Sequence, residues 1–140
     1  MKQKLILTAL VLAVLAIAGT WFFVFYKPTH FKRNVAKEAG LVITADSLVK
    51  AFQQNEAAAN TQFLNKAVEV TGTVTEVAKN ENGNTTVLIA SADAFTNVYC
   101  TLQATETKTP QPNTVISVKG LCTGFLSDVV IIDGVIVDKP

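Results

Sequence analysis

The stretch from Lys66 to Asn80, KAVEVTGTVTEVAKN, constrains the fold of this chain more than any other feature of the sequence. Its valines alternate with glutamate and threonine, and Gly72 interrupts the alternation. This period of two predicts a β-strand with one buried side and one solvent-facing side. A glycine inside such a strand predicts a bend. The stretch therefore belongs to a small, strongly coiled sheet.

Four further strands are expected after this one. Glu81-Asn82-Gly83-Asn84 predicts a hairpin turn, because Asn-Gly tolerates positive φ at both central positions. The polar, proline-bearing segment 105–113 is expected to connect the third and fourth strands. The last strand contains Gly134 and is expected to run as one strand bent at that glycine. The predicted strands are 66–78, 85–90, 95–102, 114–122 and 129–138.

A sequence pattern that occurs twice within these strands predicts that the sheet closes into a barrel. Val68-Glu-Val-Thr-Gly72 recurs as Ile116-Ser-Val-Lys-Gly120. A small barrel needs glycines within its strands, because glycine lets a strand turn the corner between two halves of the sheet. Gly72 and Gly120 are therefore the expected barrel bends. Five strands in this order, with a polar connection between the third and fourth, predict a five-stranded OB-type β-barrel.

One amphipathic helix is expected before the barrel, over residues 44–65. Thr44 or Asp46 can cap its first turn. Its apolar stripe predicts packing on the barrel and consists of Leu48, Phe52, Ala59 and Phe63. The predicted fold is thus mainly β with helices: an N-terminal transmembrane helix, one amphipathic helix and the barrel. The OB-fold domain is expected at 44–140, with the helix at 44–65 and the barrel at 66–138.

The N-terminal residues 1–26 are expected to form a transmembrane anchor. Leu5 to Tyr26 runs for 22 residues without a charge. As a helix this run is about 33 Å long, enough to cross the hydrocarbon core of a bilayer. A cleaved signal peptide is the alternative, with Ala16-Ile17-Ala18 as its cleavage site. No cysteine follows the apolar run closely, which excludes anchoring as a lipoprotein.

Residues 27–43 are expected to form a basic juxtamembrane tether with a short apolar docking patch, Leu41-Val42-Ile43. Residues 1–43 carry six Lys or Arg against one acid, whereas residues 44–140 carry six Lys against ten acids. An acidic domain repels nucleic-acid phosphates. Basic side chains beside a membrane segment favour anionic lipid headgroups. The predicted lipid contacts are residues 5–26 together with Lys27, Lys32, Arg33 and Lys37.

The two cysteines bear on the side of the membrane. Alternation along their strands predicts that Cys100 and Cys122 both face inward. In an exported domain they could form a disulfide joining the third and fourth strands. The alternative is two reduced core cysteines that act as small apolar side chains. The disulfide hypothesis favours an extracytoplasmic domain, whereas a literal use of the positive-inside rule favours a cytoplasmic one.

The chain contains no residue set typical of catalysis or of a metal site. Its one histidine, His30, lies in the tether, and the sequence has no Gly-x-Ser-x-Gly elbow and no phosphate-binding glycine loop. Two buried thiols without a spare histidine cannot complete a tetrahedral metal shell. We therefore expect no enzyme activity, no metal and no cofactor.

Residues 44–137 resemble the tRNA-anti-like family of OB-fold domains, which occurs in small membrane-anchored bacterial envelope proteins of unassigned activity. The resemblance implies the OB fold; the family name refers to its similarity to anticodon-binding OB domains. The residues that carry the resemblance are Leu48, Phe52, Asn55-Glu56 and Ala59, the run 66–74, Val98-Tyr99-Cys100, and the run 118–124.

Ligands of OB barrels bind the outer face of the second and third strands and the adjoining loops. The candidate ligand-binding residues here are Tyr99, Phe95, Asn97, Thr101 and Phe125. Lys79 and Lys108 are the few cations close by, fewer than a nucleic-acid groove needs.

The sequence therefore predicts a membrane-tethered, non-catalytic OB-fold binding or assembly module of the bacterial cell envelope. Its partner would be a protein, peptide or glycan, and nucleic acid is not favoured. The protein would be a single-pass protein of the cytoplasmic (inner) membrane with an extracytoplasmic C-terminal domain. The alternative is a nucleic-acid-binding, tRNA-anticodon-binding-like OB domain that faces the cytoplasm.

Overall fold

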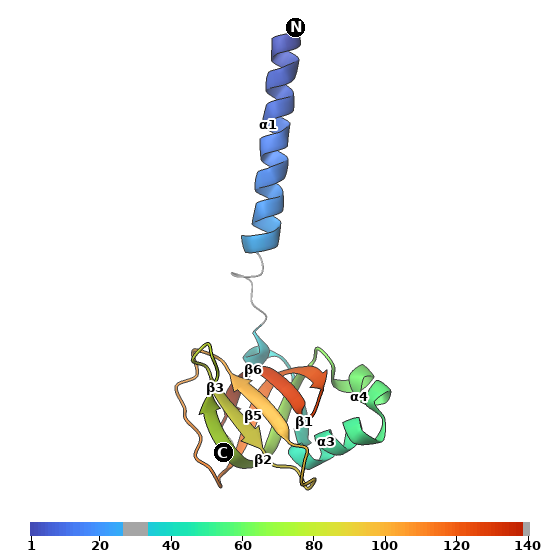
Figure 1. Cartoon of the computed structure of the whole chain (residues 1–140), viewed down its shortest axis with the longest axis vertical. Helices are drawn as coiled ribbons and strands as arrows, with labels where there is room; N and C mark the ends of the chain where they lie inside the picture. The colour runs from blue at the N-terminus through green and yellow to red at the C-terminus, as the bar shows by residue number, and fades with distance from the viewer. Residues whose placement is uncertain (27–33, 139–140) are drawn as a thin grey trace. The chain divides into compact units, whose positions relative to one another are not determined.

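A computed structural model describes residues 1–26 and 34–138 and divides the chain into two units, Met1–Asn34 and Val35–Pro140. The first unit consists of helix α1 (Lys2–Trp21) and a π-helical turn, η1 (Phe22–Tyr26) (Figure 1). Within Lys2–Phe25, an 18-residue window has a mean hydropathy of 2.4, and none of that window is buried. The segment Lys2–Phe25 is long and apolar enough to cross a membrane, as a signal sequence would also be. Lys27, Lys32 and Arg33, which are predicted to contact lipid, lie outside the described residues, and so does His30.

The second unit is a closed five-stranded barrel with one extra strand, which confirms the predicted fold class. Each strand of the barrel pairs with the next in the order β2-β3-β4-β6-β5, and β5 pairs back onto β2. The extra strand β1 lies parallel to β2, and β4 lies parallel to β6, whereas the other pairs are antiparallel. The strands are β1 (Leu41–Thr44), β2 (Ala67–Lys79), β3 (Thr85–Ile89), β4 (Val98–Leu102), β5 (Val115–Phe125) and β6 (Val129–Val137).

The long strand β2 changes partners part-way along its 13 residues. Its first half pairs with β5 up to Thr73, and its second half pairs with β3 from Val74 onward. A Cβ atom added at Gly72 would lie 2.4 Å from Cγ2 of Ile89, and one at Gly120 would lie 2.4 Å from Cγ2 of Ile131. Both distances are far shorter than a van der Waals contact. The two glycines therefore provide the room in which the barrel wall closes.

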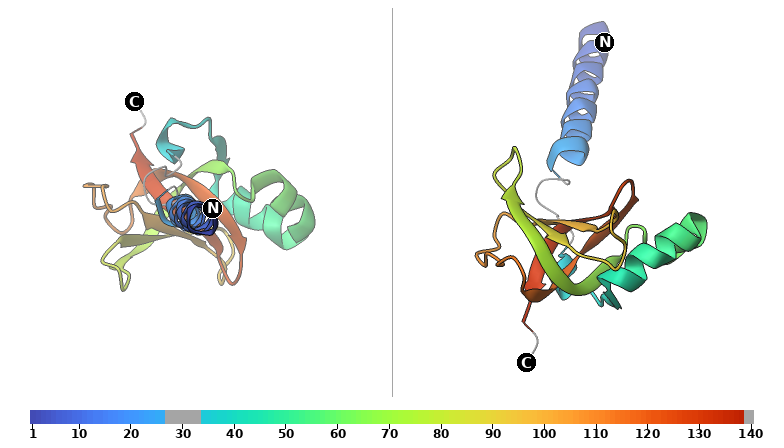
Figure 2. Two further views of the ribbon diagram at one scale, coloured as in Figure 1. Left: turned by 90° about the horizontal axis from the view of Figure 1, so that it is seen from above. Right: turned by 60° about the horizontal axis from the view of Figure 1, so that its bottom comes forward.

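The predicted single helix over 44–65 is wrong, because the segment forms two helices, α3 (Ala45–Gln54) and α4 (Glu56–Phe63). Asn55 has an extended backbone (φ −158°, ψ 93°). Its side-chain Oδ1 accepts a hydrogen bond of 3.1 Å from the N–H of Ala58 and so caps α4. Thr44 caps α3 as predicted, since its Oγ1 accepts from the N–H of Ser47 at 3.2 Å. Figure 2 shows both helices at one side of the barrel.

The folded domain begins earlier than predicted, at Val35. This residue lies in a single 3-10 turn, η2 (Val35–Lys37), and is 1% exposed. Nζ of Lys119 on β5 donates a hydrogen bond of 3.2 Å to the carbonyl of Ala36. The predicted docking patch, residues 41–43, forms most of β1. The tether assigned to 27–43 is therefore wrong over its last nine residues, which are part of the domain.

Two local predictions about glycine are supported. The turn between β2 and β3 falls where it was expected, and Oδ1 of Asn80 accepts from the N–H groups of Asn82 and Asn84 at 3.1 and 3.0 Å. Of its two central residues only Gly83 has a positive φ, 78°. β6 runs as one strand past Gly134, where a Cβ atom would lie 2.9 Å from Cγ1 of Val118.

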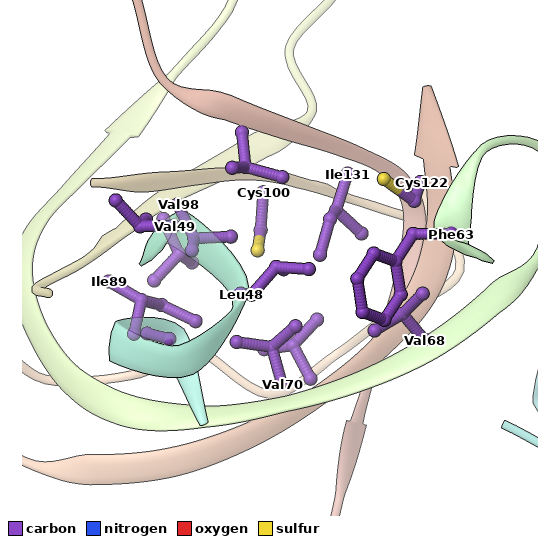
Figure 3. Close-up of a cluster of buried hydrophobic side chains, with 14 of the residues drawn as sticks. Leu48, Val49, Phe63, Val68, Val70, Ile89, Val98, Cys100, Cys122 and Ile131 are labelled. Atoms are coloured by element: carbon purple, nitrogen blue, oxygen red, sulfur yellow. The ribbon is translucent and has the colours of Figure 1, made fainter. Parts of the chain in front are cut away.

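The barrel interior is filled by apolar side chains from every barrel strand and both short helices (Figure 3). Helix α3 contributes Leu48, Val49 and Phe52, and the rings of Phe52 and Phe63 lie 6.0 Å apart between centroids. The interior is therefore closed to ligands. Any binding site must lie on the outside of the barrel.

A Gly120→Ala substitution is expected to destabilise the domain by about 1–3 kcal/mol, because the new methyl group meets backbone as well as side chain. Its Cβ would lie 2.8 Å from the carbonyl oxygen of Ile132, which cannot move aside alone. The matched control is Gly40→Ala, whose Cβ comes closest to the flexible end of Lys119, at 3.0 Å. Calorimetric melting of the full chain should show a large drop for the first variant and almost none for the second. Equal melting temperatures would contradict this account of the barrel wall.

Candidate functional site

A surface hollow of about 350 Å³ lies on the outer face of β2, β3 and β4. Pockets for small ligands start at about this volume, so the hollow is at the small end of that range. The residues that line the hollow are partly apolar and partly charged. Its lining consists of Glu76, Ala78, Lys79, Thr86, Leu88, Tyr99 and Asp128.

The strand register explains why these side chains meet. Glu76 on β2 is paired with Leu88 on β3, and Leu88 is paired with Tyr99 on β4. Side chains in one such row point to the same side of the sheet. The neighbours of Tyr99 along β4, Val98 and Cys100, are fully buried in the interior, so the row faces outward. Adjacent strands lie about 4.8 Å apart, which places the Glu76 and Tyr99 backbones roughly 10 Å from each other.

Two hydrogen bonds of the Asn97 backbone hold one rim of the hollow. The N–H of Asn97 donates to Oδ1 of Asp128 at 2.7 Å, and the N–H of Val129 donates to the carbonyl of Asn97 at 3.1 Å. These bonds tie the turn between β5 and β6 to the start of β4. Asp128 therefore stands beside Tyr99 although the two residues are far apart in the sequence.

The hollow carries two carboxylates, Glu76 and Asp128, and one ammonium group, Lys79. Nζ of Lys79 points toward its own hairpin turn, where it donates to the carbonyl of Gly83 at 3.4 Å. The face around Tyr99 is therefore acidic, in line with the excess of acidic residues over the whole domain.

The structure brings together only part of the predicted site. Tyr99 is half-buried and lines the hollow, and Thr101 lies one row further along β4, opposite Thr86. Asn97 contributes its backbone to the rim. Phe95 lies in the loop between β3 and β4 and is 91% exposed.

Phe125, a candidate ligand-binding residue in the sequence, does not line the hollow. Its ring stacks on Phe52, with centroids 5.8 Å apart and an angle of 20° between the planes. It therefore packs against the buried core. The sequence reasoning missed Glu76, Thr86, Leu88 and Asp128, because only the register between neighbouring strands reveals that they share a face with Tyr99.

The loop that carries Phe95 is ordered by Asp93. Oδ1 of Asp93 accepts from the N–H groups of Phe95 at 2.8 Å and Thr96 at 2.9 Å. The hydrogen bond from Phe95, and then that from the side chain of Gln53, lowers the pKa of the Asp93 carboxyl below its ordinary value of 3.8. This carboxylate is used to shape the loop.

Comparison with known proteins places the fold in a family. The tRNA_anti-like family matches residues 1–136, which is almost the whole chain and includes the apolar N-terminal helix.

The chain belongs to the tRNA_anti-like family.

Among solved structures, this tRNA_anti-like chain is similar to a "putative nucleic acid-binding lipoprotein" from Klebsiella pneumoniae subsp. pneumoniae. The TM-score is 0.55 at 14% sequence identity, and the match covers 69% of this chain and 92% of the other. A likeness at this identity shows a shared fold. A search of curated proteins finds no match.

Of the two alternatives for the cysteines of this tRNA_anti-like domain, the structure has the reduced pair. Cys100 and Cys122 are free and buried. Both are paired with Ile131, one from each side of β6, and Figure 3 shows Ile131 between them. Their Cα atoms are thus about two strand spacings, or roughly 10 Å, apart. A disulfide needs roughly 4.4–6.8 Å, so the disulfide of the first alternative does not fit this backbone.

Burial makes both thiols poor nucleophiles. It raises the pKa of Cys100 from its ordinary value of 9.0 to about 12, with a smaller contribution from nearby Cys122. The pKa of Cys122 is also raised by burial. Within residues 1–26 and 34–138, the structure contains no group of three or more His, Cys, Asp or Glu residues that could hold a metal ion.

Neither thiol of the folded protein is therefore expected to react with Ellman's reagent at pH 8, and both should react after denaturation without a reductant. Stability should also fall between about pH 9 and pH 12, because the unfolded thiols lose their protons there and the folded Cys100 keeps its own. A Cys100→Ala variant should show a flatter pH dependence of its melting temperature. Release of thiols only after reduction would instead support the disulfide hypothesis.

Proposed function

We propose that the chain is a membrane-anchored, non-catalytic OB-fold binding module of the bacterial envelope, which holds a protein, peptide or glycan partner in the hollow around Tyr99. The observation that carries the proposal is the position of the hollow. In OB folds the second and third barrel strands and the loops beside them bind the ligand. Here β3 and β4 are those strands, and Tyr99 stands on the outer face that they share.

The anchor is supported by the properties of the first unit. Lys2–Phe25 is long and apolar enough to span a bilayer, and its exposed aromatic residues near the C-terminal end suit the lipid–water interface. The similar fold in a Klebsiella protein named as a lipoprotein is consistent with a domain held at a membrane.

A nucleic-acid-binding module is the second candidate, because the same Klebsiella protein is named as nucleic acid-binding. The hollow of this chain argues against it. Affinity for nucleic acid comes mainly from Lys and Arg on phosphates, and two carboxylates beside one lysine repel a phosphate backbone. Tyr99 alone could stack on a base, but the acidic rim would oppose the strand that carries it.

The side of the membrane can be tested with an added thiol. Ala57 is exposed on α4, whereas both natural cysteines are buried, so Ala57→Cys introduces a single accessible thiol. In intact bacterial cells a membrane-impermeant maleimide should label this variant and leave the parent protein unlabelled. If labelling of the introduced thiol requires permeabilised cells, the domain lies in the cytoplasm and the second candidate is favoured.

The hollow can be tested by photo-crosslinking in living cells. A benzoylphenylalanine at position 99 keeps an aromatic ring in the hollow, and one at Val115, which is 70% exposed at the start of β5, serves as the control. We expect adducts at position 99 and none at position 115. Adducts that disappear on nuclease treatment would support the nucleic-acid candidate. Equal adducts at both positions, or none at either, would contradict a binding site at this hollow.

A further inference from the structure

The chemistry around the Tyr99 ring narrows the class of ligand. Tyr99 is flanked on β3 by Leu88, and Glu76 stands one strand further along the same row. On its other side Asp128 is fixed at the rim by the N–H of Asn97, at 2.7 Å. An aromatic face thus lies between two carboxylates that come from opposite edges of the hollow.

Both carboxylates can accept further hydrogen bonds. Within the part of the chain that the structure describes, Asp128 uses only its Oδ1 atom, and Glu76 has no hydrogen-bond or ion-pair partner. The single lysine of the hollow does not neutralise them, because its Nζ is directed to the carbonyl of Gly83. Two negative charges beside a ring therefore remain available to a ligand.

This arrangement is complementary to a cationic side chain. A guanidinium or ammonium group above a tyrosine ring is attracted by the negative face of the ring. Carboxylates at the sides of the ring add charge-assisted hydrogen bonds, and the planar guanidinium of arginine can make several at once. A phosphate, a carboxylate or an anionic headgroup would instead be repelled.

We propose that the hollow binds an arginine or lysine side chain presented by a basic segment of a polypeptide partner. This inference rests on the proposed function, since it uses the same hollow, and it specifies the ligand class. The charged head lies over the Tyr99 ring with Glu76 and Asp128 at its sides, and the aliphatic stem packs on Leu88. The small volume of the hollow, about 350 Å³, matches a side chain better than a whole folded surface.

The test uses the full chain in nanodiscs of zwitterionic phosphatidylcholine, with empty nanodiscs as the blank. The probe is an acetylated and amidated peptide of three Gly-Arg-Ser repeats. Its partner probe replaces each arginine with citrulline, which has nearly the same shape but no charge. We expect the arginine peptide to bind and the citrulline peptide to bind about tenfold more weakly or not at all.

Charge-neutralising variants locate the binding. Glu76→Gln combined with Asp128→Asn should weaken the arginine peptide about tenfold, while the Asn side chain at 128 can still accept from the N–H of Asn97. The control, Glu56→Gln, removes a charge from exposed helix α4, away from the hollow, and should change affinity less than about twofold. Circular dichroism melting of each variant checks that it remains folded.

Four results would overturn the inference. The first is no binding of the arginine peptide up to about 1 mM. The second is an equal loss in the control and in the double variant, which would indicate only the overall charge of the domain. The third is equal binding of both peptides that is lost in Tyr99→Ala; the hollow would then still be the binding site, and only its preference for cations would fail. The fourth is binding of an oligothymidylate in place of the peptide, lost in the same variant, which would favour nucleic acid.

Discussion

The structure depends on the pairing of β2 with β5, in which two similar sequences face each other. Val68 is paired with Gly120 and Gly72 with Ile116, so each glycine lies opposite an apolar residue of the other strand. At both glycines an interior isoleucine approaches to 2.4 Å of the position that a Cβ atom would take. The wall of a five-stranded barrel is so strongly curved that its strands cannot carry a side chain at these points. The repeated sequence pattern thus arises because both strands need a glycine where the barrel closes.

The partner change along β2 shapes the outer face that carries the hollow. Its first half lies between β1 and β5, and its second half leaves β5 and continues with β3. The helices α3 and α4 occupy one side of the barrel, and Phe52 and Phe63 help to fill its interior. On the outward row of β2, β3 and β4, Glu76 is exposed and Leu88 and Tyr99 are half-buried. The change of partner along β2 that closes the core therefore also leaves one concave face, which carries the side chains of Glu76, Leu88 and Tyr99.

Local signals in the sequence predicted the strands well, whereas features that depend on strand order were missed. Alternation and turn glycines placed the strands and the hairpin at Gly83. Asn55 lies within a helical pattern, but its side chain caps a new helix and ends the old one. Cys100 and Cys122 lie on strands that follow each other in the predicted order, yet β6 inserts between them. The parallel pairing of β4 with β6 also brings Asp128 into the hollow, so the sequence pointed to the tyrosine of the hollow and missed its carboxylates.

The barrel and its outer face impose separate requirements on the sequence. Inward positions such as Val87 and Cys100 are fully buried and must fill the core. The outward positions that alternate with them along each strand are constrained only by solvent and by any ligand. A few outward substitutions can therefore reverse the charge of the face and leave the fold intact. Membership of the tRNA_anti-like family accordingly accounts for the barrel, whereas the proposed ligand class depends on the side chains of the hollow. In this chain two carboxylates and one lysine surround the tyrosine. The ligand class must be inferred from those groups and not from the family's name.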